Sequence, residues 1–372
     1  MAPRDGDESD VESEEGCEWL LGFVEPPRRR ADLLRHRFPS KVGGRPAWLD
    51  PLHLPTQEQL TCRVSGKPLE FLLQVYAPVD DNPAAFHRTV SLFISPEGDK
   101  LAQAGTVRAL RCQLPRANRF YPPEPPKKTD VRPPQLPEDD RHASLARDRW
   151  RVVEAEQQQL GGGGAAGEAA ATANGEQHSS GGPQPGSHPR LYPEAELLVE
   201  PEQEGSDDDG AGRDEHVRQL VQAYRQQGEQ AVGYSEEELP ASLVDELGER
   251  ISPEQRHFAA FQARVGKEPS QCLRYCFDAA AKPLWPSSKN IPGPADIPIC
   301  ERCGAPRQFE FQVMPQMIVH LGVPADDPAA PDWGTIAVYS CSASCDSSVQ
   351  PGASSADESA YLEEFVWVQE SA

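Results

Sequence analysis

The chain carries two stretches in which short apolar runs alternate with polar residues and are interrupted by proline and glycine. The first lies between Trp19 and Tyr121, and the second between Cys300 and Trp367. Runs with this texture, bounded by turn residues, indicate short β-strands. The pattern predicts a mainly β (α+β) protein, in which two related antiparallel β-rich modules, residues 19–121 and 251–372, are accompanied by a few helices.

A helix is predicted at the start of the second module. Ser252 and Pro253 suit the N-cap and the first turn. The residues that share one helical face, and the glycine that suits the stop, are Phe258, Phe261, Val265 and Gly266. Further on, Cys272 and Cys276 are four positions apart, a spacing that would place both on one helical face. We interpret them as small core residues in preference to reactive or ligating thiols.

The sequence between the two modules is poor in apolar residues. Residues 122–193 hold proline clusters and a run rich in Gly, Ala and Ser, and residues 1–18 form an acidic arm. Neither can bury enough apolar surface to fold, so we expect a disordered linker and a disordered arm. Residues 194–250 hold 17 acidic and four basic side chains. The helical spacing of Val217, Leu220, Val221 and Tyr224 predicts that this acidic segment is partly helical.

The two β-rich modules resemble each other residue by residue. At a constant offset of 238 positions the following pairs match: Cys62 with Cys300, Gly66 with Gly304, Pro68 with Pro306, Phe71 with Phe309, Gln74 with Gln312 and Val75 with Val313. At an offset of 246, residues 88–95 match residues 334–341 in their alternation of apolar and small side chains. Self-similarity of this kind indicates two copies of one structural unit.

Four cysteines in the second copy have the spacing of a metal site. Cys300 and Cys303 form a Cys-x2-Cys-Gly turn, and Cys341 and Cys345 end the next predicted strand. Four thiolates leave no open coordination position, which is typical of one structural zinc ion. The alternative is four thiols without metal. In the first copy Ser65 and Ser95 replace two of the four cysteines and no cysteine corresponds to Cys345, so we expect that module to be metal-free.

The charge balance limits the classes of partner. The formal net charge is −23, which disfavours nucleic acid and anionic membranes and favours a basic protein. Arginines cluster at residues 28–45 and 108–119. We expect them to pair with the acidic segment, with RNA contact as the alternative. No run of 18 apolar residues occurs, no nucleophile stands beside a base, and no phosphate-binding loop is present. We therefore predict a non-enzymatic protein without a small-molecule substrate, a DNA target or a membrane.

Long segments of the chain are similar to a known family. They are 38–55 (FPSKVGGRPAWLDPLHLP), 69–78 (LEFLLQVYAP), 85–93 (AFHRTVSLF), 112–121 (CQLPRANRFY), 261–275 (FQARVGKEPSQCLRY), 300–317 (CERCGAPRQFEFQVMPQM), 332–345 (DWGTIAVYSCSASC) and 363–369 (EEFVWVQ). In these segments the chain resembles the programmed cell death protein 2 family, plant members in particular. Typical members carry a MYND-type zinc finger where this chain has no cysteine, between Cys112 and Cys272.

The resemblance implies a dedicated chaperone for one basic small-subunit ribosomal protein, the eukaryotic S-two protein. It would act in the cytoplasm, with nucleus or nucleolus as further locations, and would support ribosome biogenesis. The rival interpretation is a nuclear adaptor in transcription or cell-death control. We expect acidic side chains to screen the client and apolar strand surface around residues 71–78 or 309–315 to bind it. The acidic candidates are Asp207, Asp208, Asp209, Glu236, Glu237 and Glu238.

Overall fold

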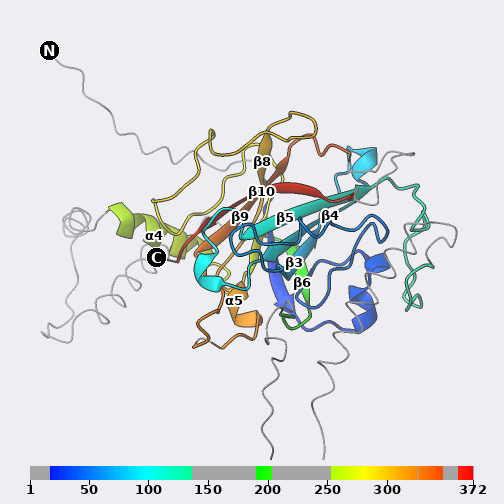
Figure 1. The fold of residues 1–372 in the computed structure, drawn as a ribbon, viewed down its shortest axis with the longest axis horizontal. Coiled ribbons are helices and arrows are strands. Elements are labelled where there is room, and N and C mark those ends of the chain that lie inside the picture. Colours follow the sequence, from blue (N-terminus) through cyan, green and yellow to red (C-terminus); the bar gives the residue numbers. More distant parts are fainter. Residues whose placement is uncertain (1–16, 136–189, 203–252, 325, 347–358, 372) are drawn as a thin grey trace, which may run out of the picture.

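The computed structural model describes residues 17–135, 190–202, 253–324, 326–346 and 359–371 (Figure 1). The strands are β1 (Leu20–Glu25), β2 (Lys41–Val42), β3 (Glu70–Tyr76), β4 (His87–Ile94), β5 (Val107–Leu114), β6 (Ala195–Pro201), β7 (Leu273–Tyr275), β8 (Arg307–Val313), β9 (Thr335–Cys341) and β10 (Leu362–Gln369). The helices are η1 (Arg30–Leu33), η2 (Arg35–Arg37), η3 (Pro83–Ala85), η4 (Gly98–Lys100), α4 (Pro253–Val265) and α5 (Met317–His320). The prediction of a mainly β protein with a few helices is confirmed.

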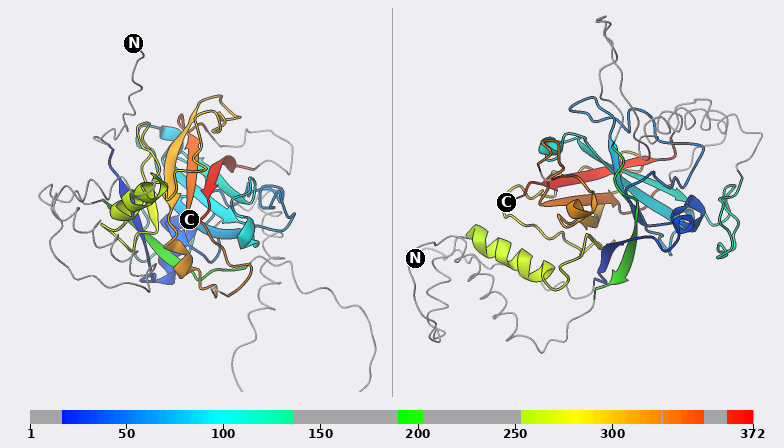
Figure 2. Two further views of the ribbon diagram at one scale, coloured as in Figure 1. Left: turned by 90° about the vertical axis from the view of Figure 1, so that its left-hand side faces the viewer. Right: turned by 90° about the horizontal axis from the view of Figure 1, so that it is seen from below.

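The described strands close into one antiparallel barrel. Their order around it is β1-β6-β2-β3-β4-β5-β10-β9-β8-β7. The two halves of the chain meet twice, where β5 pairs with β10 and where β1 pairs with β7. Each described strand has a neighbour on both sides, and closure makes the two copies parts of a single sheet. Figure 2 shows β10 lying among strands from both halves.

The sequence repeat is reproduced in the pairing of the strands. Val75 of β3 pairs with Val90 of β4, and their counterparts Val313 of β8 and Ile336 of β9 also pair. Each copy has one register irregularity at the equivalent place: between Phe71 and Leu73 in β3, and between Phe309 and Phe311 in β8. Identical register and an identical bulge indicate that the two hairpins are copies of one structure.

Strand β6 of the barrel was not predicted. Residues 195–201, which we assigned to the acidic, partly helical segment, form β6 between β1 and β2. Tyr192, which we assigned to the linker, is 3% exposed and belongs to the core. The pairing partners of β6 lie far away in the sequence, and burial of Leu197 among them favours a strand. The predicted helix around residues 217–224 and residues 136–189 of the predicted linker lie outside the described residues.

The predicted helix at the start of the second module is confirmed as α4, and its Phe261 and Val265 pack against Met314. The helical placement of Cys272 and Cys276 is wrong, because these residues flank strand β7, which pairs with both β1 and β8. The hydrogen bonds of β7 to the strands on its two sides favour a strand, although the spacing of the two cysteines also fits a helix. Both thiols are buried, as expected for core residues.

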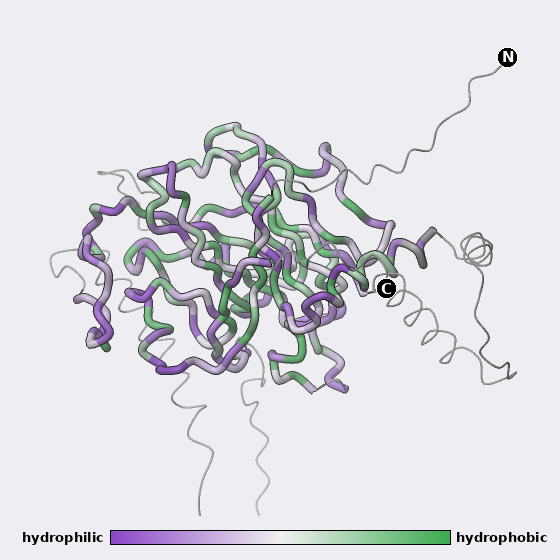
Figure 3. Tube along the Cα trace, turned by 180° about the vertical axis from the view of Figure 1, so that it is seen from behind, coloured by the Kyte–Doolittle hydropathy of each residue, from purple (hydrophilic) through white to green (hydrophobic). Residues whose placement is uncertain are grey.

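One apolar core fills the interior of the barrel. It combines side chains from both copies, for example Leu72 and Leu92 from the first and Phe311 and Ile336 from the second. Figure 3 shows hydrophobic stretches in the strands at the centre and hydrophilic stretches in the peripheral loops. Within the described part of the chain, no helix is both long and apolar enough to cross a bilayer.

Candidate metal centre

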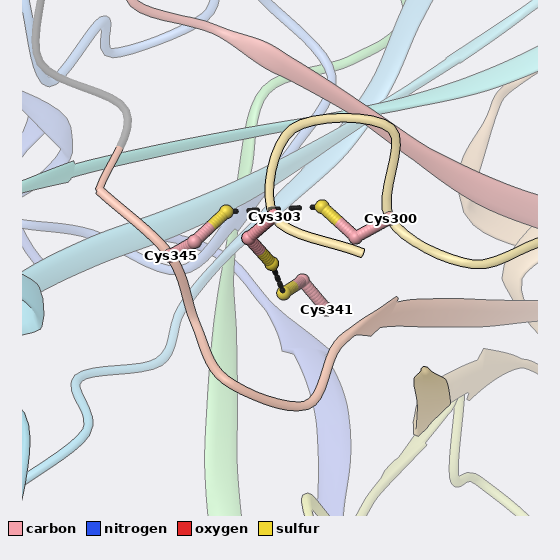
Figure 4. A group of neighbouring side chains, drawn as sticks. All are labelled: Cys300, Cys303, Cys341 and Cys345. Carbon is pink, nitrogen blue, oxygen red and sulfur yellow. Dashed lines mark hydrogen bonds between the residues drawn. The ribbon is translucent and has the colours of Figure 1, made fainter. Parts of the chain in front are cut away.

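Four cysteines meet at one end of the β8–β9 hairpin (Figure 4). Cys300 and Cys303 lie in the turn before β8, Cys341 is the last residue of β9, and Cys345 lies in the loop that follows. The hairpin register places Arg307, just after the first pair, opposite Cys341. The structure therefore brings together all four residues that the sequence predicted as ligands.

The spacing of the four sulfur atoms fits one tetrahedral ion. All lie within 4.8 Å of one another, with Cys300 Sγ 3.7 Å from Cys345 Sγ and Cys303 Sγ 3.5 Å from Cys341 Sγ. A metal–sulfur bond of about 2.3 Å gives a tetrahedron with sulfur atoms about 3.8 Å apart. The donor set is soft and complete, as in structural zinc sites. The geometry suits a closed site without a position for substrate.

The turn that carries the first pair is shaped by its backbone. The Gly304 amide donates to the Cys300 carbonyl at 2.8 Å, and the Cys300 amide donates to the Ala305 carbonyl at 2.8 Å. Gly304 has φ +75°, a left-handed conformation that residues with a Cβ rarely adopt. Glycine is therefore needed here for its backbone angle, although nothing crowds the position.

The ionisation of the thiols is uneven. Burial opposes ionisation of Cys300, but backbone amides of Cys303 and Arg302 donate to its sulfur and bring its pKa down to about 7. Burial raises the pKa of Cys345 to about 12, against the lowering effect of Arg111, and burial also raises the pKa of Cys341. Because thiolates are the ligands, an ion entering this cluster has to displace protons from at least these two residues.

The other half of the chain supports the second cysteine pair. Arg111 of β5 donates from Nη1 to the Cys345 carbonyl at 2.9 Å, and its Nη2 lies 3.6 Å from Cys345 Sγ. Arg111 is itself paired with Glu364 of β10, and Gln113 donates to the Ser344 carbonyl at 3.0 Å. The loop of the candidate metal centre thus rests on β5. The only sign of this contact in the sequence is the arginine cluster around Arg111.

The first copy has the same turn at residues 62–66 but keeps one of the four cysteines, Cys62. The Gly66 amide donates to the Cys62 carbonyl at 2.9 Å, and the Cys62 amide donates to the Lys67 carbonyl at 2.9 Å. Gly66 has φ +68°, like Gly304. The Ser65 amide donates to Cys62 Sγ at 3.4 Å, where the second copy has Cys303. In the first copy these hydrogen bonds hold the turn, at the place where the second copy has its four cysteines.

Several other predicted features have definite outcomes. The six acidic candidates at 207–209 and 236–238 lie outside the described residues. The strands at 71–78 and 309–315 are largely buried in the core, so the prediction that they offer apolar surface to a client is wrong. A central strand paired on both sides cannot expose its apolar face while that face closes the barrel.

The arginine clusters do pair internally, but mostly not with the acidic segment. Arg108 pairs with Glu363 of β10, and Arg111 pairs with Glu364 of the same strand. A pair with the acidic segment is formed by Lys41, in the first cluster, with Glu194. Other members of the first cluster donate to main-chain carbonyls of residues 122–135. Several arginines of the two clusters are therefore engaged in contacts between distant segments of the fold.

The fold and the cysteine cluster define a β-barrel protein built from two copies of one unit, with a four-cysteine centre able to hold a metal ion. Two family models match the chain: "Programmed cell death protein 2, N-terminal domain" at residues 18–128 and "Programmed cell death protein 2, C-terminal putative domain" at residues 255–370. The chain belongs to the programmed cell death protein 2 family.

Curated relatives agree with this assignment. Programmed cell death protein 2 of Rattus norvegicus is 36% identical over 366 residues, which cover 94% of this chain and 96% of the relative. The protein of the same name from Mus musculus is 36% identical over 368 residues, with the same coverage. A relative from Schizosaccharomyces pombe named "Probable 20S rRNA accumulation protein 4" is 30% identical over 125 residues, 31% of this chain and 28% of the relative. No solved structure matches the chain.

Proposed function

We propose that this chain is a non-enzymatic chaperone that binds a basic small-subunit ribosomal protein, the eukaryotic S-two protein, in the cytoplasm and so supports ribosome biogenesis. The observation that carries the proposal is the Schizosaccharomyces pombe relative, whose name connects it with the accumulation of 20S rRNA. This chain is acidic, and the phosphate backbone of RNA repels an acidic protein. A role in rRNA accumulation therefore fits binding of a basic ribosomal protein better than direct binding of RNA.

The charge distribution supports a basic client. The chain has 59 acidic and 36 basic residues. Five arginines are withdrawn from the surface by buried or nearly buried ion pairs with carboxylates: Arg88, Arg108, Arg111, Arg274 and Arg307. These five arginines pair with four carboxylates, Glu202, Glu310, Glu363 and Glu364, so the pairs remove no net negative charge and the remaining charged residues keep the acidic excess. Such a surface attracts a cationic protein at long range and orients it before contact.

We further propose that Cys300, Cys303, Cys341 and Cys345 hold one structural zinc ion. The sulfur separations and the all-thiolate donor set support this assignment. When bound, the ion would supply folding energy to the turn and loop at this end of the β8–β9 hairpin, since the ligands come from both. It would have no catalytic part, because four protein ligands exclude a substrate.

The client is tested by purifying the tagged full chain from growing cells together with translating ribosomes. We expect the sequenced messages on those ribosomes to be enriched in the message for the S-two protein. Release of nascent chains with puromycin before purification is the control, and it should abolish the enrichment. Recovery of messages with no ribosomal protein among the enriched ones would refute the chaperone proposal.

A further inference from the structure

A proline-rich segment lies against the surface of the first copy. Residues 122–135 have the sequence PPEPPKKTDVRPPQ and form neither helix nor strand. We call this segment the strap. It runs beside the short helices η1 and η2, and Figures 1 and 2 show it as a teal loop next to the blue coils of those helices. Its six prolines disfavour regular helix and sheet and favour an extended chain.

The strap is held by hydrogen bonds to its main chain. Arg29 Nη1 donates to the Lys128 carbonyl at 3.1 Å, Arg35 Nη2 to the Pro134 carbonyl at 2.6 Å, and Arg37 Nη2 to the Asp130 carbonyl at 3.0 Å. His36 Nε2 lies 2.9 Å from that same Asp130 carbonyl oxygen. Every one of these acceptors is a backbone oxygen. Residues 127–130 form a turn, in which the Asp130 amide donates to the Lys127 carbonyl at 2.9 Å. The surface therefore contacts the strap through main-chain carbonyls of this turn and of Pro134 rather than through side chains of the strap.

Aromatic rings lie beneath the strap. His36, Phe38 and Tyr121 line a cavity of about 570 Å³ together with strap prolines. Arg35 lies 5.5 Å from the centre of the Tyr121 ring, and Phe38 packs edge-on against the same ring at 4.9 Å. Aromatic surfaces combined with donors to backbone carbonyls are the means by which proteins bind polyproline II segments.

A second cavity of about 580 Å³ has Pro133, near the end of the strap, in its lining. Its lining includes Arg35, Pro46, Trp48 and the half-exposed Leu191. Four buried nitrogen atoms in and beside these two cavities have no hydrogen-bond partner among the described residues: Arg35 Nη1, His36 Nδ1, Arg37 Nε and Trp48 Nε1. Three of them, Arg35 Nη1, Arg37 Nε and Trp48 Nε1, carry hydrogen and are costly to bury unless an acceptor reaches them.

We propose that the two cavities form one groove, which binds a proline-rich segment of a partner protein, and that the strap covers the first half of this groove in cis. The partner segment displaces the strap and extends past Pro133, where its carbonyls accept from Trp48 Nε1 and Arg35 Nη1. Prolines suit this ligand because they supply acceptors without donors and lose little conformational freedom on binding. The proposal does not depend on the identity of the ribosomal client.

The strap acts as a tethered competitor. A segment linked to its own site by a short chain has an effective concentration in the millimolar range, which weakens the apparent affinity of any free peptide. Freeing the strap should therefore strengthen binding of a peptide in trans. This consequence separates a regulated groove from a segment that merely packs on the surface.

The probe is a fluorescein-labelled synthetic peptide of residues 122–135, and fluorescence anisotropy measures its binding to the full chain. In a strap-release variant the six strap prolines are replaced by serine. We expect this variant to bind the peptide at least about tenfold more tightly than the parent, because the tethered competitor has been weakened. The same peptide with serine at its six proline positions should bind much more weakly, because it keeps the carbonyls but loses the conformational restriction and the ring contacts of proline. Equal affinity for parent and release variant, or for both peptides, would overturn the proposal.

Two variant pairs test the groove itself in the release background. Arg35→Gln with Arg37→Gln should abolish peptide binding, whereas Arg28→Gln with Arg30→Gln, a charge-matched change outside the cavity linings, should leave it intact. A probe extended by five C-terminal prolines should bind more tightly than the short one, and Trp48→Phe should remove that gain while retaining the ring. Unchanged binding in the first pair, or a gain that survives Trp48→Phe, would contradict the assignment. Equal melting temperatures show that the variants are folded.

Discussion

A buried ion pair joins the two copies through the interior of the barrel. Arg88 of β4 and Glu310 of β8 are both 0% exposed, and Arg88 Nη2 donates to Glu310 Oε2 at 2.9 Å while a second bond joins Nη1 to Oε1. Ser340 of β9 donates to the same carboxylate. Burial would lower the pKa of Arg88, but Glu310 outweighs it, so the arginine stays charged.

Replacing Glu310 by Gln should destabilise the chain strongly, because it leaves the Arg88 charge buried without its counter-charge. Removing one member of a buried pair costs about 3–5 kcal/mol. At about 2–4 °C for each kcal/mol in a domain of this size, the melting temperature should fall by about 6–20 °C. Replacing both members, as Arg88→Met with Glu310→Leu, should cost far less, because no uncompensated charge then remains.

The assay is urea and thermal unfolding of the full chain, monitored by tryptophan fluorescence. The proteins compared are the parent, the single variants Glu310→Gln and Arg88→Met, and the double variant. Glu97→Gln serves as the control, because Glu97 forms a solvent-exposed pair with Lys67 and its loss should change little. A Glu310→Gln variant as stable as this control would refute the reasoning. A double variant as unstable as the singles would show that packing of the side chains, and not the uncompensated charge, controls stability there.

Three further predictions concern the metal centre and the client. Elemental analysis should find one zinc per chain, lost in Cys303→Ala and kept in Cys62→Ser, whereas zero or two zincs would contradict the assignment. Because the pKa values of Cys341 and Cys345 are raised above the ordinary thiol value, binding at neutral pH displaces at least two protons, and affinity should fall by at least about a hundredfold per unit decrease in pH, measured by chelator competition. Salt should slow association with the S-two protein more than it weakens the complex, and neutralising six acidic residues should abolish that salt effect, as stopped-flow kinetics would show. The six are Asp207, Asp208, Asp209, Glu236, Glu237 and Glu238, and the matched control neutralises Asp5, Asp7, Glu8, Asp10, Glu12 and Glu14, which should leave the rates unchanged.

Features encoded by neighbouring residues could be predicted from the sequence. The alternation in residues 88–95 and 334–341 predicts strands, and the cap and apolar face at 253–265 predict a helix. The four cysteines lie in two close pairs, so spacing alone indicates that they converge. In each case the determining residues lie within one turn, one helix or one hairpin.

Features set by distant residues could not be predicted in this way. Strand β6 lies between a Gly- and Pro-rich run and an acidic run in the sequence. Its own residues, AELLVEP, do not have the alternation of apolar and polar side chains that predicts a strand. Its strand state is decided by β1 and β2, more than 150 positions earlier in the sequence. The support of Cys345 by Arg111 is equally non-local, because it depends on β5 lying next to β10. Pairing across the two copies is invisible to any window of local sequence.

Barrel closure determines the order in which this protein can fold as it is made. Strand β5 leaves the ribosome early, but its outer edge stays unpaired until β10, far beyond it in the sequence, has been synthesised. Meanwhile Arg108 and Arg111 lack Glu363 and Glu364, their partners on that late strand. An exposed strand edge carrying unpaired cations is prone to pair with other chains. A protein proposed to protect newly made chains thus has a vulnerable interval in its own synthesis.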